Sequence, residues 1–171
     1  MRRDWERDFV DYVATRSAAL RRTAYLLCGD WHQAEDLTQL ALAKLYGAWR
    51  RIDRSGSVDA YARRTLLRTY LDERRRPWHR EYPAKELPEQ ALPTDPADDR
   101  LALMAALRSL PRSQRAVVVL RYWEDLSVAE TAAWLQISEG TVKSASARGL
   151  AALREGLQGS RKGELLTWRG V

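Results

Sequence analysis

The chain has 171 residues, of which 30% are charged, and its 29 lysines and arginines outnumber its 23 aspartates and glutamates. That length allows one domain or two small ones, and the net charge of +6 favours a polyanionic partner such as nucleic acid or an anionic membrane, although a merely soluble basic protein also fits. The composition excludes an internal disulfide, because Cys28 is the only cysteine, and no apolar run approaches the ~18 residues of a membrane span. The start MRRDWERDFV lacks the apolar core of a signal peptide, so we expect a cytoplasmic protein that does not contact a membrane.

Apolar residues recur at helical spacing from Asp4 to Arg76 and predict three or four helices, with breaks at Gly29-Asp30 and at 53–56. The expected inward-facing residues are Phe9, Val13, Leu20, Ala24 and Leu27, then Leu37, Ala41, Leu45 and Ala48, then Ala62, Leu66 and Tyr70.

The last of these helices is rich in arginine. Between Tyr61 and Arg80 there are seven arginines against Asp72 and Glu73, a surface suited to phosphate contacts. Tyr61 and Trp78 also offer rings on which an exposed base could stack. A solvated charge run, with the aromatic residues in the core, is the structural alternative.

The next stretch changes character and predicts a linker. Five of the six prolines lie between Pro77 and Pro96, and from Glu81 to Asp99 six acidic residues face one base, Lys85. Such a composition favours an extended, acidic tether rather than a third core. We therefore predict an all-α fold with two small helical domains at 1–78 and 99–157, joined by a flexible linker at 79–98 and followed by a tail at 158–171.

The segment VAETAAWLQISEGTVKS, from Val128 to Ser144, has the spacing of a helix-turn-helix. Ser127 and Glu130 form the S-x-x-E capping box that starts one helix, and Ser138 can cap a second helix that begins at Glu139. We expect Val128, Ala132 and Leu135 to face inward, with Ile137 and Val142 filling the space between the helices. An ordinary helical hairpin with a solvated charged face is the alternative.

The turn of this motif is unusual because Gln136 occupies the place where glycine is common. A left-handed conformation there costs a non-glycine residue ~1–2 kcal/mol, which predicts a strained or altered turn.

Three phrases in this order resemble the extracytoplasmic-function (ECF) sigma factors of bacterial RNA polymerase, of the actinobacterial type: TAYLLCGDWHQAEDLTQLALAKLYGAW, DAYARRTLLRTYLDERRR and LRSLPRSQRAVVVLRYWEDLSVAETAAWLQISEGTVKS. The resemblance extends from Phe9 to Leu153. It implies an alternative sigma factor whose first domain binds and melts the promoter minus-ten element and whose second domain binds the minus-thirty-five element.

The resemblance also assigns surfaces in the first domain. Asp36, Leu37, Gln39 and Leu40 match the segment that docks on the clamp helices of the polymerase beta-prime subunit, although the family usually has Glu in place of Leu40. The loop 55–59 matches the one that helps to hold a flipped base, and Arg68 replaces a common Asn. The residues matched to minus-ten DNA are Ser57, Asp59, Tyr61, Arg63, Arg64, Arg68, Asp72 and Arg75.

In the second domain, the residues matched to minus-thirty-five DNA are Ser138, Glu139, Thr141, Lys143, Ser144 and Arg148. Ala145 replaces a usual arginine, which would soften sequence preference if that arginine contacts a base. The resemblance further implies that the helix from Leu110 to Tyr122 meets the beta flap and that the linker follows the RNA exit path. It makes an anti-sigma protein a candidate partner.

Two other classes compete with this interpretation. A stand-alone helix-turn-helix regulator explains the second domain but leaves the first without a role. A small nucleic-acid enzyme is disfavoured because His32 and His79 are far apart and no metal-ligand spacing occurs. The sequence therefore predicts a protein that is not an enzyme and that has no metal site and no cofactor.

Overall fold

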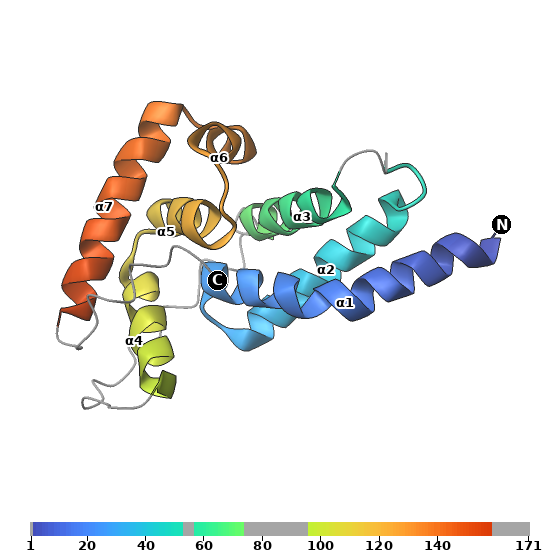
Figure 1. Cartoon of the computed structure of the whole chain (residues 1–171), viewed down its shortest axis with the longest axis horizontal. Coiled ribbons are helices and arrows are strands. Elements are labelled where there is room, and N and C mark those ends of the chain that lie inside the picture. The colour runs from blue at the N-terminus through green and yellow to red at the C-terminus, as the bar shows by residue number, and fades with distance from the viewer. Residues whose placement is uncertain (1, 53–56, 74–95, 159–171) are drawn as a thin grey trace. The chain divides into compact units, whose positions relative to one another are not determined.

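The computed structural model describes residues 2–52, 57–73 and 96–158, and the chain divides into two helical units between Lys85 and Glu86 (Figure 1). We call Met1–Lys85 unit 1 and Glu86–Val171 unit 2. No strand occurs in the described ranges, and the predicted all-α fold is confirmed. None of the helices in these ranges is both long and apolar enough to cross a bilayer.

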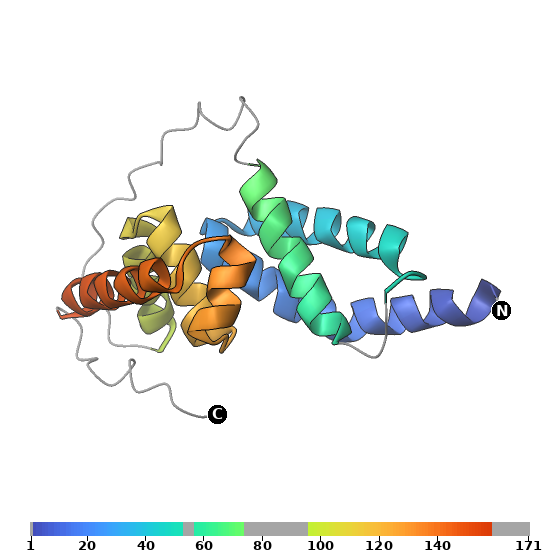
Figure 2. The same ribbon diagram turned by 90° about the horizontal axis from the view of Figure 1, so that it is seen from above.

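The described residues of unit 1 form three helices that pack on one another: α1 (Arg2–Cys28), α2 (Trp31–Ala48) and α3 (Val58–Glu73). The break between α1 and α2 lies at the predicted place, because Gly29 adopts a positive φ of 78° and the Asp30 carboxylate accepts a hydrogen bond from the Gln33 amide at 2.8 Å. Figure 2 shows α3 crossing the α1–α2 pair, and the Tyr70 hydroxyl donates to the Leu27 carbonyl at 3.1 Å. This bond fixes α3 against the end of α1.

The core of unit 1 follows the predicted helical stripes. Side chains that are at most 4% exposed include Leu20, Ala24, Leu27, Leu37, Ala41, Leu45, Ala62, Leu66 and Tyr70. Phe9, Val13 and Ala48 are only half-buried. The sequence pattern did not predict a cluster of rings that joins the first turns of α1 to the end of α2, where Phe9 lies 5.0 Å from Tyr46 and 5.1 Å from Trp49 between ring centroids.

Unit 2 contains α4 (Pro96–Ser109), α5 (Arg112–Val118), a π-helical segment η2 (Val119–Trp123), α6 (Val128–Leu135) and α7 (Glu139–Leu157). Helix α7 packs against α4, α5 and α6. It approaches α5 closely at Gly149, where an added Cβ would lie 2.6 Å from a Val118 methyl carbon.

Helix α4 begins at Pro96, two residues before the predicted end of the linker at Asp98. Proline suits this place because the first turn of a helix needs no N–H from it and its φ is already helical. The other end of α4 is tied to α5 by the buried Arg115, whose guanidinium donates to the carbonyls of Arg108 and Leu110 at 2.7 and 3.3 Å. The predicted linker residues 79–95 and the tail residues 159–171 lie outside the described ranges.

Candidate functional site

The helix caps predicted for α6 and α7 are present. The Ser127 and Glu130 capping box is formed in both directions at 3.1 and 2.8 Å, and the Ser138 hydroxyl accepts the Thr141 amide at 3.1 Å. Gln136 is left-handed, with φ 56° and ψ 45°, a conformation that costs a non-glycine residue about 1–2 kcal/mol. Both helix starts of the helix-turn-helix are therefore fixed by local side chains.

The interior of this motif is a cluster of Val117, Ala132 and Val142, with Val128 and Leu135 packed beside it. The prediction that Ile137 fills the space between the helices is wrong, because its side chain is 36% exposed. Ile137 stands between the left-handed Gln136 and the extended Ser138, where the chain reverses and neither helix provides an inner face. The sequence missed Trp134, which is 8% exposed and takes an inward place on α6.

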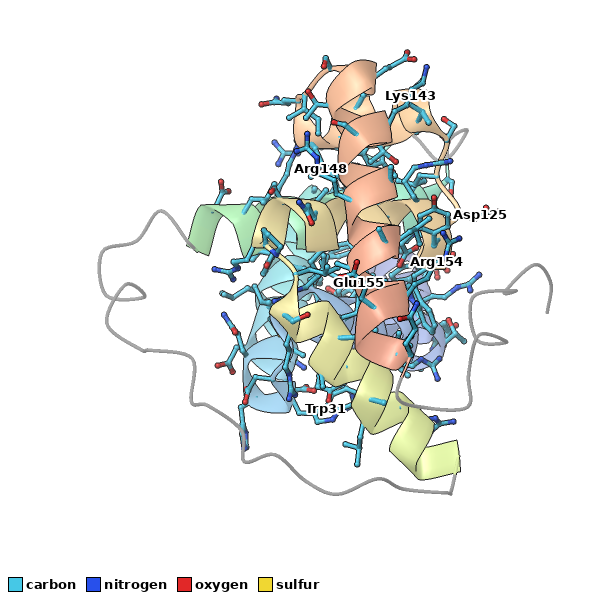
Figure 3. The ribbon with its side chains drawn as sticks, turned by 90° about the vertical axis from the view of Figure 1, so that its left-hand side faces the viewer. Trp31, Asp125, Lys143, Arg148, Arg154 and Glu155 are labelled. Atoms are coloured by element: carbon cyan, nitrogen blue, oxygen red, sulfur yellow. The ribbon has the colours of Figure 1, made fainter. Side chains whose placement is uncertain are left out.

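All six residues of unit 2 that were predicted to face DNA are exposed: Ser138, Glu139, Thr141, Lys143, Ser144 and Arg148. They do not form one stripe, because a helix turns by about 100° per residue and Lys143 and Arg148 therefore point roughly 140° apart. Figure 3 shows these two side chains on opposite sides of α7. Thr141, Ser144 and Arg148 share the outward side, whereas Glu139 and Lys143 lie on a flank.

Ala145 is placed differently from these residues. It is half-buried and packs against the Val117, Ala132 and Val142 cluster. The replacement of the family's usual arginine at this position therefore affects the edge of the packed interior of the motif, not its outward stripe.

In unit 1, four of the predicted minus-ten residues form one exposed stripe on helix α3. Tyr61, Arg64, Arg68 and Asp72 are all exposed and recur at spacings of three or four residues, which places them on one side of the helix. Arg63 is half-buried and its Nε donates to the Asp59 carbonyl at 3.4 Å. Ser57 acts locally, because its hydroxyl accepts the Ala60 amide at 3.2 Å. Arg75, Trp78 and loop residues 55–56 lie outside the described part of the chain.

A pocket of about 440 Å³ lies between the end of α2 and the start of α3. This volume falls within the range of small-molecule sites. The residues that line it are Ala48, Arg51, Ile52, Ser57, Ala60, Tyr61 and Arg64. Two guanidinium groups and one phenol ring therefore surround a space beside the α3 stripe.

Asp59 was predicted to face DNA, but its carboxylate bonds to α1. Oδ1 accepts a hydrogen bond from the Tyr12 hydroxyl at 3.0 Å, and Oδ2 pairs with Arg16 at 3.2 Å. Burial and this hydrogen bond raise the pKa of the Tyr12 hydroxyl well above its ordinary value. The sequence pattern gave no signal for this contact because 47 residues separate Tyr12 from Asp59.

The predicted polymerase-binding segment of α2 divides into two groups. Asp36, Gln39 and Leu40 are exposed, whereas Leu37 is fully buried and belongs to the core. Leu37 therefore holds α2 in place and has no surface to offer a partner.

A side-chain network that the sequence analysis missed flanks this exposed surface. Tyr25 stacks on Trp31 with centroids 3.9 Å apart, Arg21 lies over the Trp31 ring, and Trp31 itself is 49% exposed and labelled in Figure 3. Arg21 also pairs with Glu35 at 3.2 Å, and Gln39 donates to Glu35 at 3.0 Å. The Gln39 bond, and then that from Arg21, lower the pKa of the Glu35 carboxyl. The spacing of four residues between Trp31, Glu35 and Gln39, which places them on one side of α2, is the sequence signal that could have predicted this network.

The segment predicted to meet the beta flap is not one helix, because α5 starts at Arg112 and becomes π-helical from Val119. Leu110, Val117 and Leu120 are buried, whereas Tyr122 and Trp123 are 47% and 42% exposed. The exposed apolar surface of this segment is therefore confined to its end.

Family models match both units of the chain. The model of Sigma-70 region 2 matches residues 13–80, and that of Sigma-70 region 4 matches residues 100–153. The RNA polymerase sigma-E factor of Streptomyces coelicolor is 45% identical over 157 residues, which cover 88% of this chain and 86% of that protein. The ECF RNA polymerase sigma factor SigL of Mycobacterium tuberculosis is 36% identical over 152 residues, 83% of this chain and 84% of the relative.

The chain belongs to the ECF sigma factors. It is an alternative sigma factor that binds core RNA polymerase and directs it to specific promoters. The stand-alone regulator is the weaker interpretation, because a helix-turn-helix regulator does not explain the match of unit 1 to region 2.

Solved structures support the fold of this sigma factor. The sigma factor RpoE of Bartonella quintana, determined in complex with the anti-sigma factor NepR, superposes with a TM-score of 0.70 at 23% identity and covers 90% of this chain and 99% of that one. CnrH, determined in complex with the cytosolic domain of CnrY, gives 0.63 at 24% identity, with 91% and 90% covered.

Proposed function

We propose that unit 1 of this sigma factor captures the melted minus-ten element and that unit 2 binds the duplex minus-thirty-five element. The domains would be 1–78 and 99–157, with 79–98 as linker and 158–171 as tail. The pocket beside the exposed Tyr61, Arg64 and Arg68 stripe carries this proposal, because it joins a ring and two guanidinium groups in one place.

At the minus-ten element, the pocket would receive a base that has left the duplex. Unstacking a base costs a few kcal/mol, which stacking on Tyr61 and phosphate contacts from Arg51 and Arg64 would offset. Arg68, Asp72 and Arg75 would extend the contact along the strand. Unit 1 would thereby favour the open promoter over the closed one.

At the minus-thirty-five element, α7 would enter the major groove with its first turns toward base edges. Thr141, Ser144 and Arg148 on the outward stripe would contact bases, and Lys143 on the flank would contact a phosphate. Ser138 and Glu139 would lie at the groove entrance.

Core polymerase would bind through the exposed α2 residues Asp36, Gln39 and Leu40, which would dock on the beta-prime clamp helices. Tyr122 and Trp123 would meet the beta flap. The surface of α2 is also a candidate site for an anti-sigma partner, because the sigma factor RpoE, which has this fold, was determined with the anti-sigma factor NepR. The protein would act in the cytoplasm, where promoters are, and would itself form no covalent bond and need no cofactor.

Transcription from genomic fragments tests this function. Purified protein is mixed with sigma-free core polymerase and the starts of run-off transcripts are sequenced, with core polymerase alone as the control. We expect new discrete starts that share two upstream elements. Starts without a shared minus-thirty-five element would contradict the role of unit 2, and failure to bind core polymerase would favour a stand-alone regulator.

A further inference from the structure

Three side chains connect α1 to the first turn of α3 beside the pocket. The Tyr12 hydroxyl and the Arg16 guanidinium each hold one oxygen of the Asp59 carboxylate, at 3.0 and 3.2 Å. Asp59 lies in the first helical turn, where the N-terminal end of the helix dipole also favours a negative charge. With both oxygens engaged by α1, the carboxylate is neutralised in a region that otherwise presents arginines.

Tyr12 also contacts the residue at the end of α2, on the other side of the pocket. Its ring lies 5.3 Å from the ring of Trp49, which is 5% exposed and caps the end of α2. One residue of α1 thus touches the residue that caps α2 and the first turn of α3. The chain between those two contacts supplies Arg51, Ile52 and Ser57 to the pocket lining.

Two residues that line the pocket are held within their own segments. Ser57 caps the start of α3, and Arg51 makes a hydrogen bond of 3.5 Å to the Gly47 carbonyl. Helices α2 and α3 pack on each other and also on α1. At the pocket end, Tyr12 of α1 contacts both of them, through Trp49 and Asp59.

We propose that Tyr12, Asp59 and Arg16 form a latch that sets the width of the pocket and so positions it to capture an unstacked promoter base. These are positioning residues, since none of them lines the pocket. The latch deepens the proposed role of unit 1 and rests on it. The hydroxyl bond is its stronger half, because Arg16 is 54% exposed and its ion pair is screened by solvent.

The hydroxyl stays a donor under all ordinary conditions. Burial and the bond to Asp59 raise its pKa, so the phenol is protonated at neutral pH.

The test is Tyr12→Phe in the full chain, assembled with core polymerase. Phenylalanine keeps the ring on Trp49 and removes only the hydroxyl. The matched control is Tyr46→Phe, since Tyr46 belongs to the same aromatic cluster and its hydroxyl makes no hydrogen bond within the described ranges. Affinity is measured for a single-stranded minus-ten oligonucleotide and for a series in which each base in turn is absent.

Wild-type holoenzyme should lose affinity at one or two abasic positions, which identifies the captured base. Tyr12→Phe should bind the intact oligonucleotide about fivefold to tenfold more weakly, and bind the oligonucleotide that lacks the captured base as tightly as wild type does. Tyr46→Phe should behave as wild type throughout. Asp59→Ala combined with Tyr12→Phe should be no worse than Asp59→Ala alone.

Three results would overturn the latch. One is unchanged affinity of Tyr12→Phe for the intact strand. Another is an equal loss at every abasic oligonucleotide, which indicates general destabilisation. The third is additive loss in the double variant. If wild-type holoenzyme shows no base-dependent affinity at all, the proposed function of unit 1 fails and the latch fails with it.

Discussion

Unit 1 and unit 2 present their proposed DNA-binding residues in different ways. In unit 2, these residues lie on one helix, between its N-cap Ser138 and Arg148 in its middle, and the Ser138 cap fixes the start of that helix. In unit 1, the pocket lies between the end of α2 and the start of α3, and the bond from Tyr12 to Asp59 connects α3 to α1 beside it. A single helix suits a groove of regular duplex, whereas a pocket between helix ends suits a base that has left the stack. This difference supports the proposal that unit 1 binds the melted promoter and unit 2 the duplex.

The largest expected effect separates these two roles. Tyr61→Ala combined with Arg64→Ala should reduce promoter opening by the holoenzyme roughly 100-fold, because base stacking alone is worth ~1–3 kcal/mol. Permanganate reactivity of thymines in the minus-ten element measures opening. Arg154→Ala, an exposed arginine at the far end of α7, is the control and should have no effect (Figure 3). Full promoter opening by the double variant would show that the pocket has no role in opening.

The second prediction concerns polymerase binding by unit 1. Trp31→Ala should weaken core binding about tenfold or more, because an exposed tryptophan held by a stack has the properties of an interface hot spot. Trp31→Phe should retain most of the affinity, and Asp36→Ala with Gln39→Ala should also weaken it. Fluorescence anisotropy with labelled sigma factor measures the three affinities. Equal binding by Trp31→Ala would exclude the network from the interface.

The third prediction concerns the contacts of α7. Lys143→Ala and Arg148→Ala should each weaken binding to minus-thirty-five duplex, and a phosphate contact should also lower the slope of log affinity against log salt by ~0.9. We expect the lower slope for Lys143→Ala. Arg148→Ala should instead relax sequence preference, with a cost of ~1–3 kcal/mol at the contacted base. Identical salt slopes for both variants and wild type would leave the two sides of α7 without distinct roles.

A fourth prediction uses two glycines of α7. Gly149→Ala should destabilise unit 2 by about 1 kcal/mol, because overpacking against Val118 outweighs the better helix propensity of alanine. Gly140→Ala should stabilise it or leave it unchanged, since its added Cβ meets nothing closer than the Ser138 hydroxyl at 3.8 Å. Urea unfolding measures both. A stabilising Gly149→Ala would mean that α5 and α7 are not in close contact there.

The smallest effect is the pH dependence of the capping box. The Ser127 amide and hydroxyl lower the pKa of the Glu130 carboxyl below 4.5, so its contribution to stability is present above pH 4.5 and is lost as the pH falls through the lowered value. Wild type should therefore lose slightly more stability than Glu130→Gln between pH 5 and 3, roughly the range in which carboxyls titrate. Parallel melting curves for the two proteins would contradict the bond.

The sequence predicted most of unit 2 because its signals are local. The capping box, the Ser138 cap and the inward positions of Ala132 and Val142 all depend on residues within a few positions of one another. The error at Ile137 arose because the turn geometry at Gln136 decides where that side chain points. Local patterns do not contain this information.

In unit 1, the helices were predictable from the sequence but the contacts between them were not. The helical stripes and the break at Gly29 were predictable, since they follow from periodicity and from one residue's conformational freedom. The bond from Tyr12 to Asp59 and the stack of Tyr25 on Trp31 depend on how three helices cross. Leu37 was predicted both to face inward and to bind the polymerase. Its burial confirms the first prediction and removes it from the surface that Asp36 and Gln39 share.

The division of labour between the units is tested most directly by two affinities of the holoenzyme, one for a single-stranded minus-ten oligonucleotide and one for a minus-thirty-five duplex. Both are measured for wild type, for Tyr61→Ala with Arg64→Ala, and for Lys143→Ala with Arg148→Ala. The first variant should lose affinity only for the single strand, and the second variant only for the duplex. Loss of both affinities in either variant would show that the two units do not have separate roles.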